Sequence, residues 1–515
     1  MSKNSFLVAL LMTAFTIPLS VAAAQTKSPS KTEPWKPEDV IYAETIPDFT
    51  LSPDTRWVAW IKSEGDKEKD TRISNLYLSS MTEDREIQLT RGTDNVSQPH
   101  WSPDGEWIAF LSSRPRPQAK PDTAPMQIWL INSRGGEPFF LTELARAPLQ
   151  VDWLNKDTLI FSAQEDSTAF EAAQKKKKDD SEVVDDSEHE PPVRLFSITV
   201  RDKKITRLTN NTDWIQRCAV SKDGKYAVAV HAKSLHYVFD QKVPPVTVLH
   251  NLSDGSEKTI FTEGRMRPGL FSWAPDNSGF YAAVPFSNDP KFLTASIEQL
   301  YFYDVARGKA QQVPLDWENG LGNDLHTTND GFVALLAAGH RFEAAHYTRE
   351  KSGDAWNWKR TSIGGDHAHN ISFFVASDDG KTFVYEYSTA SIMPQLYRAQ
   401  VDGAKITSPV QLTKLNEKLL KSRSFAKTEI VRWRGANNEE VEGILYYPTN
   451  YEAVKKYPLI TAIHGGPAGS DKDFWSESWA YPINLLTQRG TFVLRPNYHG
   501  SNNYGLKWVE SICCG

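Results

Sequence analysis

One short phrase recurs along most of this 515-residue chain and limits the folds open to it. Its clearest copies are LSPDTRWVAWI from Leu51 and WSPDGEWIAFL from Trp101. In each copy a strand ends, Ser-Pro-Asp-Gly or a relative makes a tight turn, and an alternating strand follows. An acidic or amide side chain anchors the turn at seven positions, namely Asp54, Asp104, Asn155, Asp223, Asp276, Asp330 and Asp379.

A second strand pair follows each turn phrase, as in QIWLINS near Trp129 and QLYFYDV near Tyr303. Closing phrases such as IQLT and VQLT complete the unit. The spacing is about 50 residues, in the range of four-stranded propeller blades. The sequence therefore predicts a mainly β fold with an N-terminal β-propeller over residues 25–420, seven-bladed by the number of anchors. A two-sheet sandwich is the alternative, although sandwiches do not need a fixed period of this length.

The composition agrees with a β-rich, acidic protein. Aromatic residues make up 11% of the chain and include 16 Trp, which suits large packed sheet faces. The formal net charge of −6 disfavours a nucleic-acid partner, because nucleic-acid-binding proteins usually carry a basic bias. Only three cysteines occur, so a hydrophobic core rather than disulfides is expected to stabilise the fold.

The first residues have the pattern of a secretory signal peptide, predicted over residues 1–24. Lys3 supplies the positive start, residues 6–21 an apolar run, and three alanines at 22–24 a small-residue cleavage site. An uncleaved membrane anchor is the alternative, which the short run disfavours. The pattern predicts an exported protein, periplasmic or extracellular, that is not held in a membrane after cleavage.

A charged stretch interrupts the third repeat. Residues 165–192 contain four consecutive lysines followed by a run of acidic residues. Such a composition buries little apolar surface, so the sequence predicts a flexible, solvated insertion within the propeller. A gate or a partner-docking arm is the less favoured alternative.

The pattern changes after residue 416. Two alternating strands, 430–433 and 441–446, flank the polar turn GANN. YPLITA then reads as a strand buried on both faces, WSESWAYPINLLTQRG as a helix, and TFVLRPNY as another buried strand. Strand, helix and strand in this order predict a βαβ unit, the start of a parallel sheet.

Two segments of this last region are specific, KKYPLITAIHGGP and RPNYHGSNNYG. With the repeats before them, they resemble the prolyl oligopeptidase family of serine peptidases, and most closely its acylaminoacyl-peptidase and dipeptidyl-peptidase-like branches. In that family the second segment usually reads Asn-Tyr-Arg-Gly-Ser-x-Gly-Tyr-Gly. Here His499 replaces the Arg and Asn503 replaces a Gly. The resemblance implies that residues 426–515 are the first part of an α/β-hydrolase domain.

The resemblance also implies a serine-type peptidase that cuts short peptides and limits substrate size with its propeller. No cofactor is expected, and a metal site at Asp366, His367 and His369 is a disfavoured alternative, because no further ligand is apparent. A backbone N–H of Gly465 or Gly466 is the expected donor to the oxyanion, since glycines expose N–H groups. Tyr457 matches a position where some branches use a tyrosine hydroxyl for the same task. A plain strand-to-loop turn is the alternative for the glycines, and packing on the sheet the alternative for Tyr457. His464 is not expected to be the catalytic base, which comes late in the family's chains.

The motif that carries the family's nucleophile, Gly-x-Ser-x-Gly, does not occur in the 515 residues. The family's Ser, Asp or Glu, and His would all fall beyond Gly515, so we expect an inactive fragment of a peptidase. The alternative is a non-catalytic extracytoplasmic propeller that binds peptides or proteins. An esterase is a third reading, which the propeller disfavours.

Overall fold

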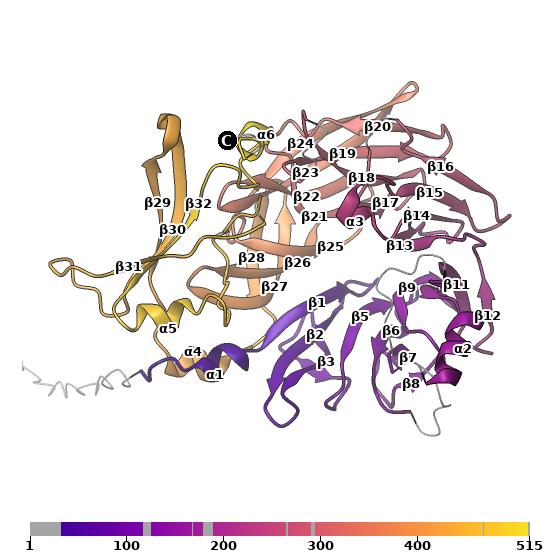
Figure 1. Ribbon diagram of the computed structural model, residues 1–515, viewed down its shortest axis with the longest axis horizontal. Helices are drawn as coiled ribbons and strands as arrows, with labels where there is room; N and C mark the ends of the chain where they lie inside the picture. The colour runs from indigo at the N-terminus through magenta and orange to yellow at the C-terminus, as the bar shows by residue number, and fades with distance from the viewer. Residues whose placement is uncertain are drawn as a thin grey trace, which may run out of the picture.

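The computed structural model describes residues 32–515 apart from 117–124, 167, 179–188, 264–265, 290–293, 467 and 513–515. The predicted signal peptide at 1–24 lies outside the described residues. Figure 1 shows two parts, a large array of strands β1–β28 and a smaller sheet, β29–β32, in orange and yellow at the left. Among the described residues, no helix has the length and apolar character needed to cross a membrane.

Antiparallel pairing divides the first 28 described strands into seven consecutive groups of four. Within a group each strand pairs with the next along the chain, which makes a meander. The first three groups contain β1 (Thr45–Leu51), β2 (Trp57–Asp66), β3 (Thr71–Ser80), β4 (Glu86–Gln88), β5 (Val96–Trp101), β6 (Trp107–Ser112), β7 (Gln127–Asn132), β8 (Phe139–Phe140), β9 (Pro148–Asn155), β10 (Thr158–Gln164), β11 (Val193–Thr199) and β12 (Ile205–Arg207).

The remaining four groups repeat this arrangement, and short pairings of β11 with β13, β19 with β21 and β24 with β28 join neighbouring groups. The groups contain β13 (Trp214–Val220), β14 (Tyr226–Ala232), β15 (Val246–Asn251), β16 (Glu257–Ile260), β17 (Leu270–Trp273), β18 (Gly279–Phe286), β19 (Ile297–Asp304), β20 (Lys309–Val313), β21 (Leu321–Thr328), β22 (Gly331–Ala338), β23 (Arg341–Ser352), β24 (Ala355–Gly365), β25 (Ile371–Ala376), β26 (Thr382–Thr389), β27 (Ile392–Asp402) and β28 (Lys405–Gln411).

The predicted turn anchors all lie where the first strand of a group turns into the second. In the first group, Ser52 Oγ donates to Asp54 Oδ1 at 2.6 Å and accepts from the backbone N–H of Trp57 at 3.0 Å. Ser102 and Asp104 repeat the contact at 2.6 Å in the second group. The local chemistry of the repeated phrase, in which a short polar side chain bonds the turn backbone, therefore sets the turn between the first and second strands of a group.

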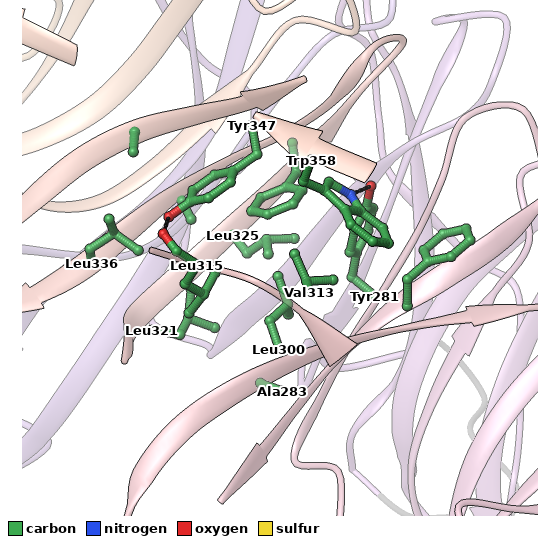
Figure 2. Close-up of a cluster of buried hydrophobic side chains, with 14 of the residues drawn as sticks. Tyr281, Ala283, Leu300, Val313, Leu315, Leu321, Leu325, Leu336, Tyr347 and Trp358 are labelled. Atoms are coloured by element: carbon green, nitrogen blue, oxygen red, sulfur yellow. Dashed lines mark hydrogen bonds between the residues drawn. The ribbon is translucent and has the colours of Figure 1, made fainter. Parts of the chain in front are cut away.

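Seven buried hydrophobic clusters lie between neighbouring groups. Figure 2 shows the cluster between the fifth and sixth groups, where Tyr347 Oη donates to the carbonyl of Leu315 at 2.6 Å. Another cluster returns from the seventh group to the first, because Trp60 of β2 packs with Val384 and Leu396. The first and last groups therefore share a core although they lie far apart in sequence.

The smaller sheet has the strand order β29-β30-β32-β31, and only β31 and β32 are parallel neighbours. It forms from β29 (Thr428–Arg434), β30 (Glu440–Tyr446), β31 (Leu459–Thr461) and β32 (Phe492–Asn497), with helix α5 (Ile483–Thr487) between β31 and β32 and α6 (Leu506–Glu510) after them. The predicted strand–helix–strand order and the hairpin before it are confirmed.

Two details of this region differ from the sequence prediction. The helix expected over WSESWAYPINLLTQRG is only the short α5, because Pro482 stands at its N-cap and no regular helix precedes it. The strand expected to be buried on both faces is β31, an edge strand whose Leu459 and Ile460 are exposed. Within the described residues, no further strand covers the free edge of β31.

The described residues also form four further α-helices and the short 3-10 helix η1 (Ala436–Asn438). The α-helices are α1 (Pro37–Ile41), α2 (Ala169–Lys177), α3 (Tyr237–Asp240) and α4 (Glu417–Ser422). Helix α2 occupies the described part of the charged insertion, where the sequence prediction had no helix. Thr168 Oγ1 accepts from the backbone N–H of Glu171, and the Glu171 carboxylate accepts from the backbone N–H of Thr168. This capping box explains the start of the helix.

The smaller sheet contacts the strand groups at the ends opposite to the Ser-Pro-Asp turns. The backbone N–H of Ala390, in the β26–β27 turn, donates to Asp473 at 2.9 Å, and Asn288 after β18 donates to Glu510 at 3.1 Å. A cavity of about 800 Å³ lies at the other end, among the turns themselves. Its walls include Trp101, Trp153, Trp273, His100 and His326.

Candidate functional site

The candidate site begins where β31 ends, in the described residues 463–466 and 468–471, which we call the glycine loop. The ring of His464 stacks on Tyr498, with centroids 4.5 Å apart and planes at 15°. Tyr498 Oη donates to the carbonyl of His464 at 2.6 Å, and His464 Nε2 lies 3.0 Å from Ser501 Oγ. The loop is therefore held by the segment that follows β32.

The contact between His464 and Ser501 has the atoms of a serine–histidine pair but not the setting of a nucleophile. Ser501 is fully buried, and its hydroxyl donates to the carbonyl of Tyr498 at 2.7 Å. A nucleophilic hydroxyl must reach substrate and give its proton to the base. The pair therefore fixes the loop. Sequence reasoning missed this contact, because 37 residues separate its members.

The backbone of Gly465 and Gly466 is open to solvent, as both residues are exposed. A Cβ added to Gly465 would meet nothing within 4 Å, whereas one added to Gly466 would lie 2.7 Å from the backbone nitrogen of Gly469. Gly466 also has a φ of +130°, which side chains rarely adopt. Among the described residues, neither N–H has a hydrogen-bond acceptor. Two open donors thus follow a parallel strand, while Pro467 lies outside the described residues.

Tyr457 lies before β31, whereas the glycines lie after it, so the structure does not bring them together. Its hydroxyl accepts from the backbone N–H of Glu452 at 2.9 Å and donates to the carbonyl of Asn450 at 3.3 Å. Its ring packs edge-on against Phe492, 5.9 Å away. In this structure Tyr457 closes the loop before β31.

Residues 497–505, which we call the asparagine segment, hold the other side of the glycine loop. The buried Asn497 accepts from the backbone N–H of Asp471 at 2.7 Å and donates to its carbonyl at 2.8 Å. The backbone N–H of Asn502 donates to the carbonyl of Ala468 at 3.2 Å. The two specific sequence segments therefore meet in space, as a shared site requires.

The two positions that depart from the family pattern keep defined contacts. His499 bonds Glu439 through Nε2 and stacks on Trp508, with centroids 4.3 Å apart. Asn503 has a φ of +74°, a left-handed conformation that asparagine tolerates better than most residues. Its Nδ2 donates to the carbonyl of Arg341 at 2.9 Å. Asn503 thus keeps a backbone suited to glycine and adds a bond to the strand groups.

The described residues contain no group of three or more His, Cys, Asp or Glu side chains arranged to hold a metal ion. The neighbouring Asp366, His367 and His369 do not converge on such a point. His367 stacks on Tyr387, with centroids 3.8 Å apart, and His369 pairs with Glu343 at 3.2 Å.

Comparison with known proteins shows which proteins the chain is similar to. No protein-family model matches the chain. It is 22% identical to the uncharacterized peptidase YuxL of Bacillus subtilis over 512 residues, which cover 92% of this chain and 72% of that protein. It is 32% identical to dipeptidyl-peptidase 5 of Porphyromonas endodontalis over 134 residues, or 26% of this chain and 18% of that protein. An acylaminoacyl peptidase in complex with Z-Gly-Gly-Phe-chloromethyl ketone has the same fold, with a TM-score of 0.66 at 17% identity over 92% of this chain and 68% of that one.

The chain therefore has homologues that are named as peptidases, and solved structures of peptidases share its fold. A puromycin-hydrolyzing peptidase of Mycobacterium tuberculosis, with a TM-score of 0.61 at 13% identity, matches over 94% of this chain and 71% of that one. A prolyl endopeptidase structure, with a TM-score of 0.57 at 13% identity, matches over 92% and 64%. The structural likeness to these solved structures extends over both the strand groups and the smaller sheet, since each match covers more than nine tenths of the chain.

Proposed function

We propose that the chain is part of an exported serine-type oligopeptidase or aminopeptidase that hydrolyses short peptides. In this proposal β1–β28 form a seven-bladed propeller, and residues 426–515 are the first part of an α/β-hydrolase domain. Seven four-stranded groups with a core shared between the last and the first support the propeller. Peptidase homologues support the reaction class. The predicted signal peptide at 1–24 is the basis for export.

One observation carries the proposal: two open backbone N–H groups, of Gly465 and Gly466, stand at the carboxyl end of a parallel strand. Hydrolysis of a peptide bond places negative charge on the carbonyl oxygen in the transition state. Fixed N–H groups aimed at that oxygen stabilise the charge and need no rearrangement during the reaction. We assign this role to the two glycines rather than to Tyr457, because the Tyr457 hydroxyl is already bonded to its own loop.

The sequence contains no Gly-x-Ser-x-Gly, and the serine nearest a histidine in the glycine loop, Ser501, is buried. We therefore propose that the 515-residue chain binds peptides without cutting them. The same observation favours the second candidate function, a propeller that binds peptides or proteins outside the cytoplasm and was never catalytic. The two differ in where the peptide binds: at the glycine loop or on the strand groups alone.

We further propose that the strand groups restrict substrate size. The cavity of about 800 Å³ and the smaller sheet lie at opposite ends of the strand groups. A peptide approaching through the strand groups would therefore pass from the cavity to the smaller sheet. A passage that continued from this cavity, whose walls include Trp101, Trp153 and Trp273, would admit an extended segment and exclude a folded domain. This gating would apply equally to a binding protein.

The purified 515-residue protein, treated with a serine-directed fluorophosphonate probe and with peptide-amide and simple-ester substrates, tests the proposal. We expect no labelling and no hydrolysis of either substrate class, together with measurable binding of labelled short peptides. Probe labelling with amide cleavage would show that a serine of this chain is the nucleophile. Failure to bind any short peptide would contradict the first candidate function and the peptide-binding form of the second.

A further inference from the structure

A two-residue turn of the strand groups lies directly against the smaller sheet. Gly339 and His340 join β22 to β23, whose ends pair Ala338 with Arg341. The backbone N–H of Gly339 donates to the carbonyl of Asn503 at 2.8 Å. Asn503 Nδ2 donates in return to the carbonyls of Gly339 and Arg341. The backbone of the turn is thus bonded to the asparagine segment from both sides.

The carboxylate of Glu442, in β30, collects donors from the turn and from the asparagine segment. Its Oε1 accepts from the backbone N–H of His340 at 3.0 Å and lies 2.9 Å from His340 Nδ1. The same oxygen accepts from the hydroxyl of Tyr504 at 2.6 Å, and Oε2 accepts from Arg432 at 3.0 Å. Although burial opposes ionisation, the bonds from His340 and Tyr504 lower the pKa of Glu442 to about 2. At neutral pH it is a carboxylate, a strong acceptor.

The path continues from Tyr504 to the glycine loop. Asn497 Nδ2 donates to Tyr504 Oη at 2.7 Å and to the carbonyl of Asp471 at 2.8 Å. Asn497 Oδ1 accepts from the backbone N–H of Asp471 at 2.7 Å. The carbonyl of His340 also accepts directly from the backbone N–H of Asp473 at 2.7 Å. Hydrogen bonds thus run without a break from the turn to the end of the glycine loop.

We propose that the β22–β23 turn positions the glycine loop, with His340 and Glu442 as the positioning residues. Removing a donor from a buried carboxylate lowers the stability of the fold, so Glu442 holds His340 and Tyr504 in one arrangement. Moving the turn then moves Tyr504 and Asn497, and with them Asp471. The positioning rests on these contacts alone, whereas its importance for oxyanion binding rests on the proposed function.

Hydrogen exchange of the full 515-residue chain, read by mass spectrometry, tests this inference without any substrate. In His340→Ala, the hydrogen-bonded amides of Asp471 and Asn502, read in peptides covering 463–471 and 497–505, should exchange about tenfold faster, because the buried Glu442 carboxylate loses the side-chain donor of His340. The matched control is Asn288→Ala, which removes a different contact between the strand groups and the smaller sheet, the 3.1 Å bond to Glu510. That variant should leave the exchange of 463–471 unchanged.

Tyr504→Phe interrupts the same path at its middle and keeps the ring, so it separates positioning from general loss of structure. It should speed exchange in 463–471 while the turn at 339–341 keeps its protection through Asn503. If His340→Ala speeds exchange throughout β1–β28, that variant has lost structure generally. The exchange of 463–471 in Tyr504→Phe then tests the inference. Unchanged exchange of 463–471 in Tyr504→Phe, or in a folded His340→Ala, would overturn the inference.

Discussion

Asp213 Oδ1 lies 2.7 Å from His231 Nδ1 inside the fourth strand group, and this contact begins a buried chain of ionisable side chains. His231 Nε2 lies 3.0 Å from His250 Nε2, and the two side chains are 2% and 5% exposed. Lys233 bonds the other oxygen of Asp213, and Glu257 lies 3.6 Å from His250. The space between His231 Nε2 and His250 Nε2 accommodates one proton.

This arrangement predicts that acid destabilises the fourth strand group. Burial, and then the neighbouring His231, lower the pKa of His250 from 6.5 to about 4. Between those values the unfolded chain binds a proton that the folded chain does not, so stability falls as pH falls. The loss attributable to His250 from pH 7 to pH 4.5 is about 2–3 kcal/mol.

Thermal unfolding of the parent chain and of His250→Gln at both pH values checks the effect. The decrease in Tm on acidification should be smaller in the variant, because glutamine carries no titrating group. An equal decrease in both proteins would show that His250 does not titrate on unfolding.

A second prediction concerns the close approach at Gly339. Its φ is +66°, and a Cβ there would lie 2.7 Å from Glu442 Oε1. Gly339→Ala should therefore lower the free energy of unfolding by about 2 kcal/mol, through the backbone conformation and the crowding of a buried carboxylate. Gly353, in the β23–β24 turn, is the matched control, with a φ of +59° and nothing within 4 Å of an added Cβ.

Gly353→Ala carries the same backbone penalty without the crowding, so it should cost about 1 kcal/mol. Urea unfolding followed by tryptophan fluorescence compares the two variants. Equal losses would mean that the turn does not press on Glu442.

The features that local chemistry determines could be predicted from the sequence, and those that depend on distant partners could not. The anchor at Asp54 was predictable because its bonds reach only a few residues along the chain. The role of Glu442 was not, because His340 is 102 residues away and Tyr504 is 62 residues away. The long helix expected before Gly490 failed because Pro482 outweighed the helical pattern.

The glycine loop stands between these cases. Its glycines predict an open backbone, which the structure has at Gly465 and Gly466. Nothing in the local sequence shows that Asn497 holds Asp471 by both backbone groups. That contact depends on the pairing of β31 with β32, which only the folded sheet provides.

A third prediction tests the core shared by the first and last strand groups. Leu396 is fully buried in the cluster that includes Trp60 and Val384. Leu396→Ala should cost about 3 kcal/mol, from the lost burial and the cavity left behind. Val410→Ala on β28, where the valine is 42% exposed, is the control and should cost less than about 1 kcal/mol.

Limited proteolysis shows where the damage falls. In Leu396→Ala the first cleavages should appear in the first and seventh groups, since the cluster joins them. Cleavage confined to the third and fourth groups would argue that the array is not closed through this core.

In the proposed function, a peptide binds at the open backbone of the glycine loop. Fluorescence anisotropy with a labelled short peptide tests it in Gly465→Val, because a Cβ added there has nothing within 4 Å and the valine should cover the backbone donors. Gly364→Val is the control, because Gly364 has equal space and lies in β24. We predict a Kd at least about tenfold higher for Gly465→Val, equivalent to one or two lost hydrogen bonds, and no change for Gly364→Val. Equal Kd values for Gly465→Val and the parent chain would contradict the claim and place any bound peptide on the strand groups.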